Sequence, residues 1–399
     1  MSKLYDLINE LCPNGVEYKK IIDVLMQPIT DGPHETPKLV SEGIPFVSVE
    51  AIHDGIIDIS KCRGYISIHD STVYRKKYKP AIGDVYMTKS ATIGRVALVV
   101  NNVNFDIWSP IAAMRPNQEI ITPRFLFYLL QTEQIQSNCK KRASKGSQPN
   151  LGMRNLEVLD IPVPPLPVQE EIVRILDNFT KLKAELTAEL TARKKQYEYY
   201  RDELLKNNDG KIYKLKEIGK VCMCKRIMKD QTSSSGDVPF YKIGTFGKTA
   251  DAFISRELFD KYTSNYSYPQ KGDILISCSG TIGRTVVFDG KPAYFQDSNI
   301  VWIDNDEKIV TNKYLNFLYQ LNPFIVSTGG TINRLYNSGI EEAEVMIPLL
   351  SEQQRIVSIL DRFDTLCNDI KRGLPAEIEY RTKQYEYYRD KLLTFKRIN

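Results

Sequence analysis

One stretch, residues 168–206, carries an apolar pattern that fits a long helix and little else. Its apolar residues recur at steps of three, four and seven: Ile172, Leu176, Phe179, Leu182, Leu186, Leu190, Tyr197, Tyr200 and Leu204. This spacing keeps one face of a helix apolar and would scatter over both faces of a strand. No Gly or Pro interrupts the stretch after Pro167. Because ordinary globular helices are much shorter, the pattern predicts a coiled-coil element.

The same stretch returns near the end of the chain. Residues 352–363 resemble residues 168–179, and residues 195–202 and 383–390 share the run Lys-Gln-Tyr-Glu-Tyr-Tyr-Arg-Asp. Two long apolar stripes in one chain can bury each other, so we expect two globular segments, each followed by one long helix. The second copy contains Gly373 and Pro375, which predict a break or kink at that point.

The globular segments also repeat, although more weakly. Four elements are predicted in two copies each. They are a strand at 43–49 and 237–243, a strand–turn–strand unit at 83–95 and 272–284, a helix at 125–130 and 314–319, and an extended segment marked by Pro at 160–166 and 345–350. The offset between the copies is 194 residues from Pro45 to Pro239 but 184 from Asp177 to Asp361. Framework elements therefore persist while loops differ, which suggests one fold used twice to read two different things. Two copies are too few for a solenoid.

The composition is that of a globular protein without membrane-spanning segments, disulfides or bound zinc. Hydrophobic residues make up 42% of the 399 residues and charged residues 26%, as in ordinary globular proteins. We find no membrane-spanning run and no signal peptide, and we expect a cytoplasmic protein. The seven Cys are scattered without metal-ligand spacing, which predicts reduced thiols and neither a disulfide framework nor a zinc site. The net charge of +5 permits a polyanionic partner without requiring one.

The ordered set of motifs, occurring twice, resembles the specificity (S) subunit of type I restriction-modification systems. The resemblance is carried by the two Tyr-rich runs, the helix starts, the paired Thr-Ile-Gly-Arg turns, and residues 11–18 and 373–379. It covers essentially the whole chain. It implies an α+β fold with two similar mixed α/β target-recognition domains. Two long helices would separate the domains and form an antiparallel coiled coil, with a pseudo-twofold internal repeat.

The resemblance also implies a division of the chain and its partners. We expect a first target-recognition domain at 1–160, a central long helix at 161–206, a second domain at 207–346, and a C-terminal long helix at 347–399 interrupted near 373–375. Each domain would read one half of a bipartite DNA target. The expected partners are double-stranded DNA, two modification (methyltransferase) subunits and ATP-dependent restriction subunits. The chain itself would be no enzyme and hold no cofactor or metal, with S-adenosylmethionine expected on the modification subunit.

The paired turns are the first candidate DNA contacts. Their small hydroxyls and Arg side chains could approach phosphates. The candidate residues are Lys89, Ser90, Thr92, Arg95, Ser279, Thr281 and Arg284. The alternative is a purely structural turn, with Ile93 and Ile282 in the core and the Arg side chains in salt bridges.

Two loops are the second set of candidates. Residues 140–150 are basic, small and amide-rich, so that Lys and Arg could neutralise phosphates and an amide could read adenine. Residues 327–334 are the counterpart. The candidates are Lys141, Arg142, Lys145, Ser147, Gln148, Asn150, Thr331, Asn333 and Arg334. The alternative is a solvated surface loop, because basic loops are common.

The long helices offer candidate partner contacts. Tyr197, Tyr200, Tyr385 and Tyr388 lie on or beside the apolar stripe, so we expect them in the intrachain core. The expected partner-binding residues are Tyr199, Arg201, Tyr387 and Arg389.

Catalytic motifs are not evident. Residues 244–249 approach a phosphate loop but lack its first Gly, where Lys242 stands, and the three His lack ligand spacing. Residues 321–324 approach the signature of adenine methyltransferases but lack its second Pro. Two alternatives to a DNA-reading subunit stay open: a scaffold that joins partners without reading bases, and an enzyme with an unrecognised nuclease or methyltransferase site.

Overall fold

The computed structural model describes residues 2–101, 103–144, 146, 149–327 and 333–398, which form two compact units. Unit 1 combines Met1–Thr187 with Glu377–Asn399, and unit 2 is Ala188–Ala376. A single helix, α6 (Leu166–Lys206), contributes its first half to unit 1 and its second half to unit 2. Each unit therefore holds one globular domain with the first part of one long helix and the last part of the other.

The globular part of unit 1 is built on two sheets. A four-stranded sheet has the order β2-β10-β7-β8, and a three-stranded sheet has the order β6-β3-β9. Their strands are β2 (Thr30–Asp31), β10 (Ile111–Met114), β7 (Val85–Thr88), β8 (Val96–Leu98), β6 (Gly64–Ile66), β3 (Ile44–Val47) and β9 (Asp106–Ile107). The shorter pairs are β1 (Glu17–Lys20) with β11 (Asp160–Val163) and β4 (Ile52–His53) with β5 (Ile56–Ile57). The helices are α1 (Ser2–Leu11), α2 (Ile68–Tyr74), α3 (Pro123–Leu130), α4 (Glu133–Arg142) and α5 (Met153–Glu157).

Unit 2 repeats this plan. Its four-stranded sheet has the order β13-β19-β16-β17, its three-stranded sheet β15-β14-β18, and β12 pairs with β20. The strands are β12 (Lys211–Lys214), β13 (Gly219–Cys222), β14 (Val238–Tyr241), β15 (Ala252–Ile254), β16 (Ile274–Ser277), β17 (Thr285–Val287), β18 (Tyr294–Phe295), β19 (Ile300–Asn305) and β20 (Glu344–Ile347). The helices are α7 (Arg256–Asn265), α8 (Asn312–Gln320) and α9 (Asn337–Glu341). Short 3-10 turns occur at Ile21–Val24, Val49–Ala51, Ile59–Lys61, Leu215–Glu217 and Lys229–Gln231.

The repeat extends to strand direction and burial. In the three-stranded sheets, β3 and β14 each pair antiparallel with one neighbour and parallel with the other. In the four-stranded sheets, every residue of the inner strands β7 and β16 is buried, as expected for strands covered on both faces. The expected fold class, two similar mixed α/β domains with long helices, is confirmed.

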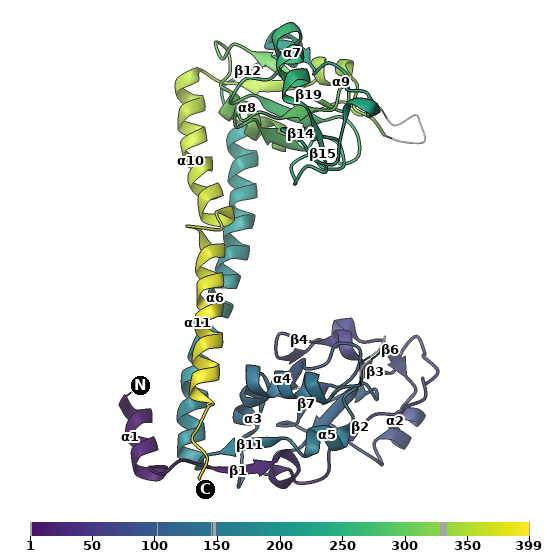
Figure 1. Ribbon diagram of the computed structural model, residues 1–399, viewed down its shortest axis with the longest axis vertical. Helices are drawn as coiled ribbons and strands as arrows, with labels where there is room; N and C mark the ends of the chain where they lie inside the picture. Colours follow the sequence, from purple (N-terminus) through teal and green to yellow (C-terminus); the bar gives the residue numbers. More distant parts are fainter. Residues whose placement is uncertain (1, 102, 145, 147–148, 328–332, 399) are drawn as a thin grey trace. The chain divides into compact units, whose positions relative to one another are not determined.

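The long helices differ in continuity. The helix α6 is unbroken, whereas the C-terminal helical region is divided into α10 (Leu350–Asn368) and α11 (Leu374–Leu392) (Figure 1). A side chain at Gly373 would place its Cβ 2.4 Å from the carbonyl oxygen of Thr365, so the turn requires glycine. The carboxylate of Asp369 accepts hydrogen bonds from the backbone N–H groups of Lys371 and Arg372, at 2.7 and 3.2 Å. Pro375 then stands near the start of α11, where its missing N–H costs little.

Within each unit the helices pack through equivalent aromatic residues. In unit 1, Phe179 of α6 stacks on Tyr388 of α11 with ring centroids 5.5 Å apart. In unit 2, Phe363 of α10 stacks on Tyr200 of α6 at 5.9 Å. Both contacts join the start of one helix copy to the end of the other, as an antiparallel pair requires.

The helix ends also share the hydrophobic cores of the domains. Ile172, Leu176 and Leu393 belong to the main core cluster of unit 1. Leu205, Ile356 and Leu360 occupy the corresponding places in unit 2. No helix in the described part of the chain is long and apolar enough to cross a membrane.

Candidate DNA interface and its duplicated framework

The paired Thr-Ile-Gly-Arg turns have the same internal hydrogen bonds in both units. In unit 1, the backbone N–H of Arg95 donates to the Thr88 hydroxyl at 3.0 Å, and that hydroxyl donates to the carbonyl oxygen of Thr92. In unit 2, the N–H of Arg284 donates to the Ser277 hydroxyl at 2.9 Å, and that hydroxyl donates to the carbonyl oxygen of Thr281. A buried hydroxyl at the end of the inner strand therefore fixes the turn in each unit.

Both glycines of these turns are required by their backbone conformation, and each faces the end of a neighbouring side chain. Gly94 has a φ of 97° and Gly283 a φ of 78°, in the left-handed region that favours glycine. A Cβ at Gly94 would lie 2.0 Å from the Gln136 side chain, and one at Gly283 would lie 2.6 Å from Asn322. The structural interpretation of the two glycines is thus supported by geometry.

The two arginines of the turns hold neighbouring loops. Nη1 of Arg95 donates to the carbonyl oxygen of Val49 at 3.2 Å, and Nη1 of Arg284 donates to that of Phe246 at 3.1 Å. These carbonyls follow the equivalent strands β3 and β14. The geometry gives both arginines a structural role, whereas Thr92 and Thr281 are exposed and accessible to a ligand.

The candidate loops lie directly beside these turns. In unit 1, Ser90 and Asn150 form a β-bridge, and the backbone N–H of Leu151 donates to the carbonyl oxygen of Lys89 at 2.7 Å. In unit 2, the N–H of Leu335 donates to the carbonyl oxygen of Cys278 at 2.9 Å. The structure thus joins the turn and the loop of each unit through residues that lie about 60 positions apart in the sequence.

The flanks of the two loops are closed in different ways. In unit 1, the N–H of Ser144 donates to the carbonyl oxygen of Asn150 at 2.9 Å, and the N–H of Asn150 donates to the Ser144 hydroxyl at 3.0 Å. In unit 2, the N–H of Ser327 donates to the carbonyl oxygen of Arg334 at 3.1 Å, and Nη2 of Arg334 donates to that of Ser298 at 3.1 Å. Asn333 is exposed, and the Ser279 hydroxyl donates to Oδ1 of Asn299 at 2.8 Å. The candidates Lys145, Ser147, Gln148 and Thr331 lie outside the described residues.

Positive charge gathers on only one of the loops. Lys140, Lys141 and Arg142 form the last turn of α4 and are exposed, and none has an ion-pair partner among the described residues. Cations at a helix C-terminus also stabilise the helix itself, which is the alternative role for this cluster. Unit 2 has Arg334 alone in the corresponding loop.

The candidate Lys89 is held in an ion pair inside unit 1. Its side chain is only 10% exposed, and its ammonium nitrogen lies 3.4 Å from the buried carboxylate of Asp31. A cation in a buried pair is not available to a phosphate without breaking that pair. The equivalent position in unit 2 is Cys278, so this pair is specific to unit 1.

Of the candidate partner-binding residues, the two tyrosines are exposed and the two arginines donate hydrogen bonds to the aspartate that follows them in the chain. Tyr199 is 64% exposed and Tyr387 is 60% exposed, and each forms an edge-on pair with the next tyrosine of its helix. Nε of Arg201 donates to Asp202 at 2.9 Å, and Nε of Arg389 donates to Asp390 at 3.0 Å. An exposed tyrosine that packs edge-on against the next ring of its helix is therefore duplicated, one copy in each unit.

The remaining tyrosines of the runs face the protein. Burial raises the pKa of Tyr197 and of Tyr385 to about 12. The hydroxyl of Tyr197 donates to Gln320 at 3.0 Å. Both residues stay protonated at neutral pH and serve the intrachain core, as the apolar stripe predicted.

Two buried glutamines were missed by the sequence reasoning. Gln169 and Gln353 are 0% exposed and begin the two copies of the long helix. In unit 1, Oε1 of Gln169 accepts from the N–H of Thr122, and its Nε2 donates to the carbonyls of Ile120 and Pro164, all at 2.8 Å.

Gln353 makes the same three hydrogen bonds in unit 2. Its Oε1 accepts from the N–H of Thr311, and its Nε2 donates to the carbonyls of Ile309 and Pro348, all at 2.9 Å. Thr122 and Thr311 are the N-caps of α3 and α8. Each glutamine therefore fixes the long helix to its globular domain. The matched Gln at the two helix starts was the available signal.

Charged groups on the described residues do not form a recognisable metal centre. No group of three or more His, Cys, Asp or Glu side chains in the described ranges is placed to hold a metal ion.

Comparison with known proteins agrees with this architecture. The family described as "Type I restriction modification DNA specificity domain" matches residues 13–193 and again residues 207–380. The description names a DNA specificity domain and not a methyltransferase or nuclease domain.

Individual proteins named as specificity subunits are similar to this chain over most of their length. A putative type I restriction enzyme specificity subunit of Haemophilus influenzae is 54% identical over 288 residues, which cover 70% of this chain and 74% of that protein. The EcoR124I/EcoR124II specificity subunit of Escherichia coli is 32% identical over 321 residues, covering 73% of this chain and 77% of that protein. A chain of a solved type I R-M system has the same fold, with a TM-score of 0.61 at 18% identity over 96% of this chain and 98% of that one. With its two DNA specificity domains, the chain belongs to the family of type I restriction-modification specificity subunits.

Proposed function

We propose that this chain reads a bipartite double-stranded DNA target, with one half-site contacted by each unit. The observation that carries the proposal is a shared framework that presents different loops. The turn hydroxyls of Thr88 and Ser277 make the same hydrogen bonds, yet the adjoining loops are a basic 11-residue segment at 140–150 and a nearly uncharged segment at 327–334. Two readers of identical DNA would have no need of different loops.

The proposed contacts are the exposed and half-buried polar residues at the junction of turn and loop. In unit 1 they are Ser90, Thr92, Lys141, Arg142 and Asn150, with Lys145, Ser147 and Gln148 added from the sequence. In unit 2 they are Ser279, Thr281, Asn333 and Arg334, with Thr331 added from the sequence. Arg95 and Arg284 act through the loops that they hold, and Lys89 stays in its ion pair with Asp31.

The proposed partners of the chain follow from its family and from the duplicated helices. A specificity subunit directs modification and restriction subunits, and S-adenosylmethionine would be held by the modification subunit. Two equivalent exposed tyrosines, Tyr199 and Tyr387, support two copies of the modification subunit. The aromatic ring and hydroxyl of tyrosine suit such an interface.

Salt-dependent DNA binding by the assembled complex tests the assignment in unit 1. Replacing Lys141 and Arg142 with Ala should reduce the slope of log K against log salt by about 1.8, the value for two lost phosphate contacts, with base preference unchanged. Lys76→Ala is the matched control, because Lys76 is an exposed cation of the same domain outside the proposed interface. An unchanged slope in the double variant, or an equal loss in the control, would refute the assignment.

A further inference from the structure

In unit 1 the C-terminal residues of the chain cover the paired strands β1 and β11. The backbone N–H of Val16 donates to the carbonyl oxygen of Lys396 at 2.8 Å, and the N–H of Ile398 donates back to Val16 at 3.0 Å. The hydroxyl of Tyr18 donates to the carbonyl oxygen of Phe395 at 2.8 Å. Phe395 packs against the core cluster of unit 1. We call residues 394–398 the tail.

Besides the apolar contact of Phe395, the tail makes a charged contact through Arg397. Nη1 of Arg397 lies 3.3 Å from Oδ2 of Asp160 on β11, and the guanidinium group lies 5.2 Å from the centre of the Tyr18 ring. The covering segment therefore combines an aromatic side chain with a cation two residues later. That spacing places the two side chains on the same side of an extended segment.

Strand register identifies the same site in unit 2. Pairing of Glu17 with Val163 in unit 1 corresponds to pairing of Lys211 with Ile347 in unit 2. The residues equivalent to Tyr18, Pro162 and Asp160 are Ile212, Met346 and Glu344. An apolar surface with a carboxylate at the matching position is thus present in both units.

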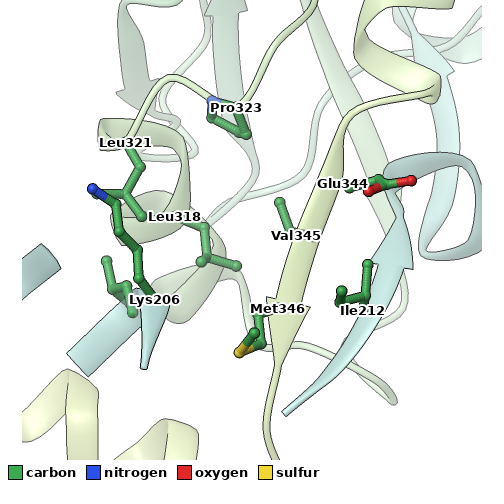
Figure 2. Close-up of a pocket in the computed structure, with 9 residues that line it drawn as sticks. Lys206, Ile212, Leu318, Leu321, Pro323, Glu344, Val345 and Met346 are labelled. Atoms are coloured by element: carbon green, nitrogen blue, oxygen red, sulfur yellow. The ribbon is translucent and has the colours of Figure 1, made fainter. Parts of the chain in front are cut away.

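In unit 2 this site is an open pocket. It has a volume of about 300 Å³ and is lined by Leu205, Lys206, Ile212, Leu318, Leu321, Pro323, Glu344, Val345 and Met346. Figure 2 shows Leu318, Val345 and Met346 in the middle of the pocket, with Lys206 and Glu344 on opposite sides. Ile212 is 58% exposed, and Glu344 has no ion-pair partner among the described residues.

The chain leaves α6 by a route that keeps the pocket uncovered. Nδ2 of Asn208 donates to the carbonyls of Leu204 and Leu205, at 3.0 and 3.2 Å, and closes the end of the helix. The backbone N–H of Gly210 donates to the Asn208 side chain at 3.0 Å, and β12 begins at the next residue. The residues equivalent to the tail are 206–210, which form the connection that runs directly into β12. Asn207 and Asp209 stand at the positions of Phe395 and Arg397, so the connection supplies neither an aromatic ring nor a cation.

We propose that this pocket binds an extended segment of a partner protein that carries an aromatic residue followed two positions later by arginine. The aromatic ring would fill the apolar pocket beside Leu318 and Met346, as Phe395 packs against the core cluster of unit 1, which includes Leu129, the residue equivalent to Leu318. The guanidinium group would pair with the unpartnered carboxylate of Glu344, as Arg397 pairs with Asp160. The negative charge of Glu344 requires a cation in the bound segment. A hydrogen bond between a guanidinium group and a carboxylate is stronger than one between neutral groups. This docking site is independent of DNA reading.

A peptide from the chain itself is the probe. A fluorescent peptide of residues 391–399 is titrated with the full-length chain and followed by anisotropy. Saturable binding is expected. Replacing the phenylalanine or the arginine of the peptide with alanine should weaken binding at least about tenfold, the effect of losing a charged hydrogen bond or a buried ring. Absence of saturable binding by the unaltered peptide would overturn the proposal.

Variants of the chain locate the site. Glu344→Lys and Met346→Asp should each weaken peptide binding at least about tenfold, since they reverse the charge or place a charge in the apolar pocket. Asp160→Lys is the matched control, because it alters the equivalent carboxylate in unit 1 and leaves the pocket intact. Loss of binding in the control, with binding kept in the Glu344→Lys variant, would show that the peptide exchanges with the tail and would overturn the proposal.

The outcome can be separated from that of the proposed DNA-reading function. Glu344 is exposed, so the Glu344→Lys chain should keep its circular dichroism spectrum and melting temperature. Its assembled complex should bind the same DNA target with the same half-sites. Loss of peptide binding with unaltered target choice supports the docking site, whereas altered half-sites would count against the separation of the two roles.

Discussion

The buried glutamines give the sharpest energetic prediction. Gln169→Leu and Gln353→Leu should each destabilise their own unit by about 3–6 kcal/mol. Each substitution leaves one backbone N–H and two carbonyl groups, all buried or partly buried, without their partner. An unsatisfied buried group costs about 1–3 kcal/mol, and local relaxation and the added apolar surface of leucine offset part of the sum. Since whole domains are stable by about 5–15 kcal/mol, the loss should be large.

The two tryptophans allow each unit to be followed separately. Trp108 lies in unit 1 and Trp302 in unit 2, and the chain has only these two. Urea unfolding monitored by fluorescence in a Trp302→Phe background reports unit 1, and in a Trp108→Phe background it reports unit 2. Gln169→Leu should shift the first transition alone and Gln353→Leu the second alone, each without a change of slope.

An exposed neighbour provides the control for this experiment. Gln354 follows Gln353 in α10 and is exposed, so Gln354→Leu should change the stability of unit 2 by no more than about 0.5 kcal/mol. A loss below about 1 kcal/mol for either buried glutamine would refute the reasoning about unsatisfied groups. Equal losses for Gln353 and Gln354 would show that leucine in this turn, and not the hydrogen bonds, is responsible.

Three further predictions concern ionisation, spacing and chemistry. Arg174, and then Lys3, hold the pKa of Glu171 at about 2, whereas an unfolded glutamate titrates near about 4.3. The stabilisation by the Glu171 carboxylate is therefore complete above about pH 5 and is lost as the pH falls toward about 2. The melting temperature of the wild type should exceed that of the Glu171→Gln variant by less and less as the pH falls through that window. A difference in melting temperature that stays constant with pH would contradict this prediction. Duplicating residues 187–190 lengthens α6 by about 6 Å. The four added residues rotate the rest of the helix by about 40° more than one full turn, so the apolar face stays nearly in register. Mapping of methylated sites should then show unchanged half-sites and a spacer longer by about one or two base pairs of about 3.4 Å, and an unchanged spacer would mean that the helix does not set it. Finally, the isolated chain should transfer no methyl group and cut no DNA, and turnover by the partner-free protein would refute that expectation.

The repeated pattern made much of the fold predictable. The spacing of Ile172, Leu176 and Phe179 predicted the long helix, and their counterparts near 352–363 predicted a second. The paired strand–turn–strand segments predicted equivalent domains. Gly94 and Gly283 were recognisable as turn residues because few other residues adopt a positive φ.

Features that depend on contacts between distant residues were not predictable. Lys89 looked like a phosphate ligand, but its partner Asp31 comes from a strand 58 residues earlier, and no local pattern indicated that pair. Gln169 and Gln353 were not singled out, because glutamine is mostly exposed in proteins and nothing in the sequence marks these two as buried. Their burial follows from the meeting of the helix start with α3 or α8.

The aromatic pairs that join the long helices within each unit could not be derived from periodicity. Apolar periodicity gives the length of a helix and the face it buries, but it does not identify the segment that covers that face. The partners of Phe179 and Phe363 come from the far copy of the repeat in each case. The cover that the tail provides at Tyr18 likewise joins residues 377 positions apart.

The central claim is that two units with one framework read two different half-sites independently. Mapping of methylated sites in a host that carries the complete system tests it most directly, comparing the wild type with a Gln148→Ala chain and with a chain altered within 327–334. The account predicts that the first change relaxes base preference in one half-site, by about 1–3 kcal/mol if the contact is direct, and that the second alters only the other half-site. A change of both half-sites by either variant would contradict the account.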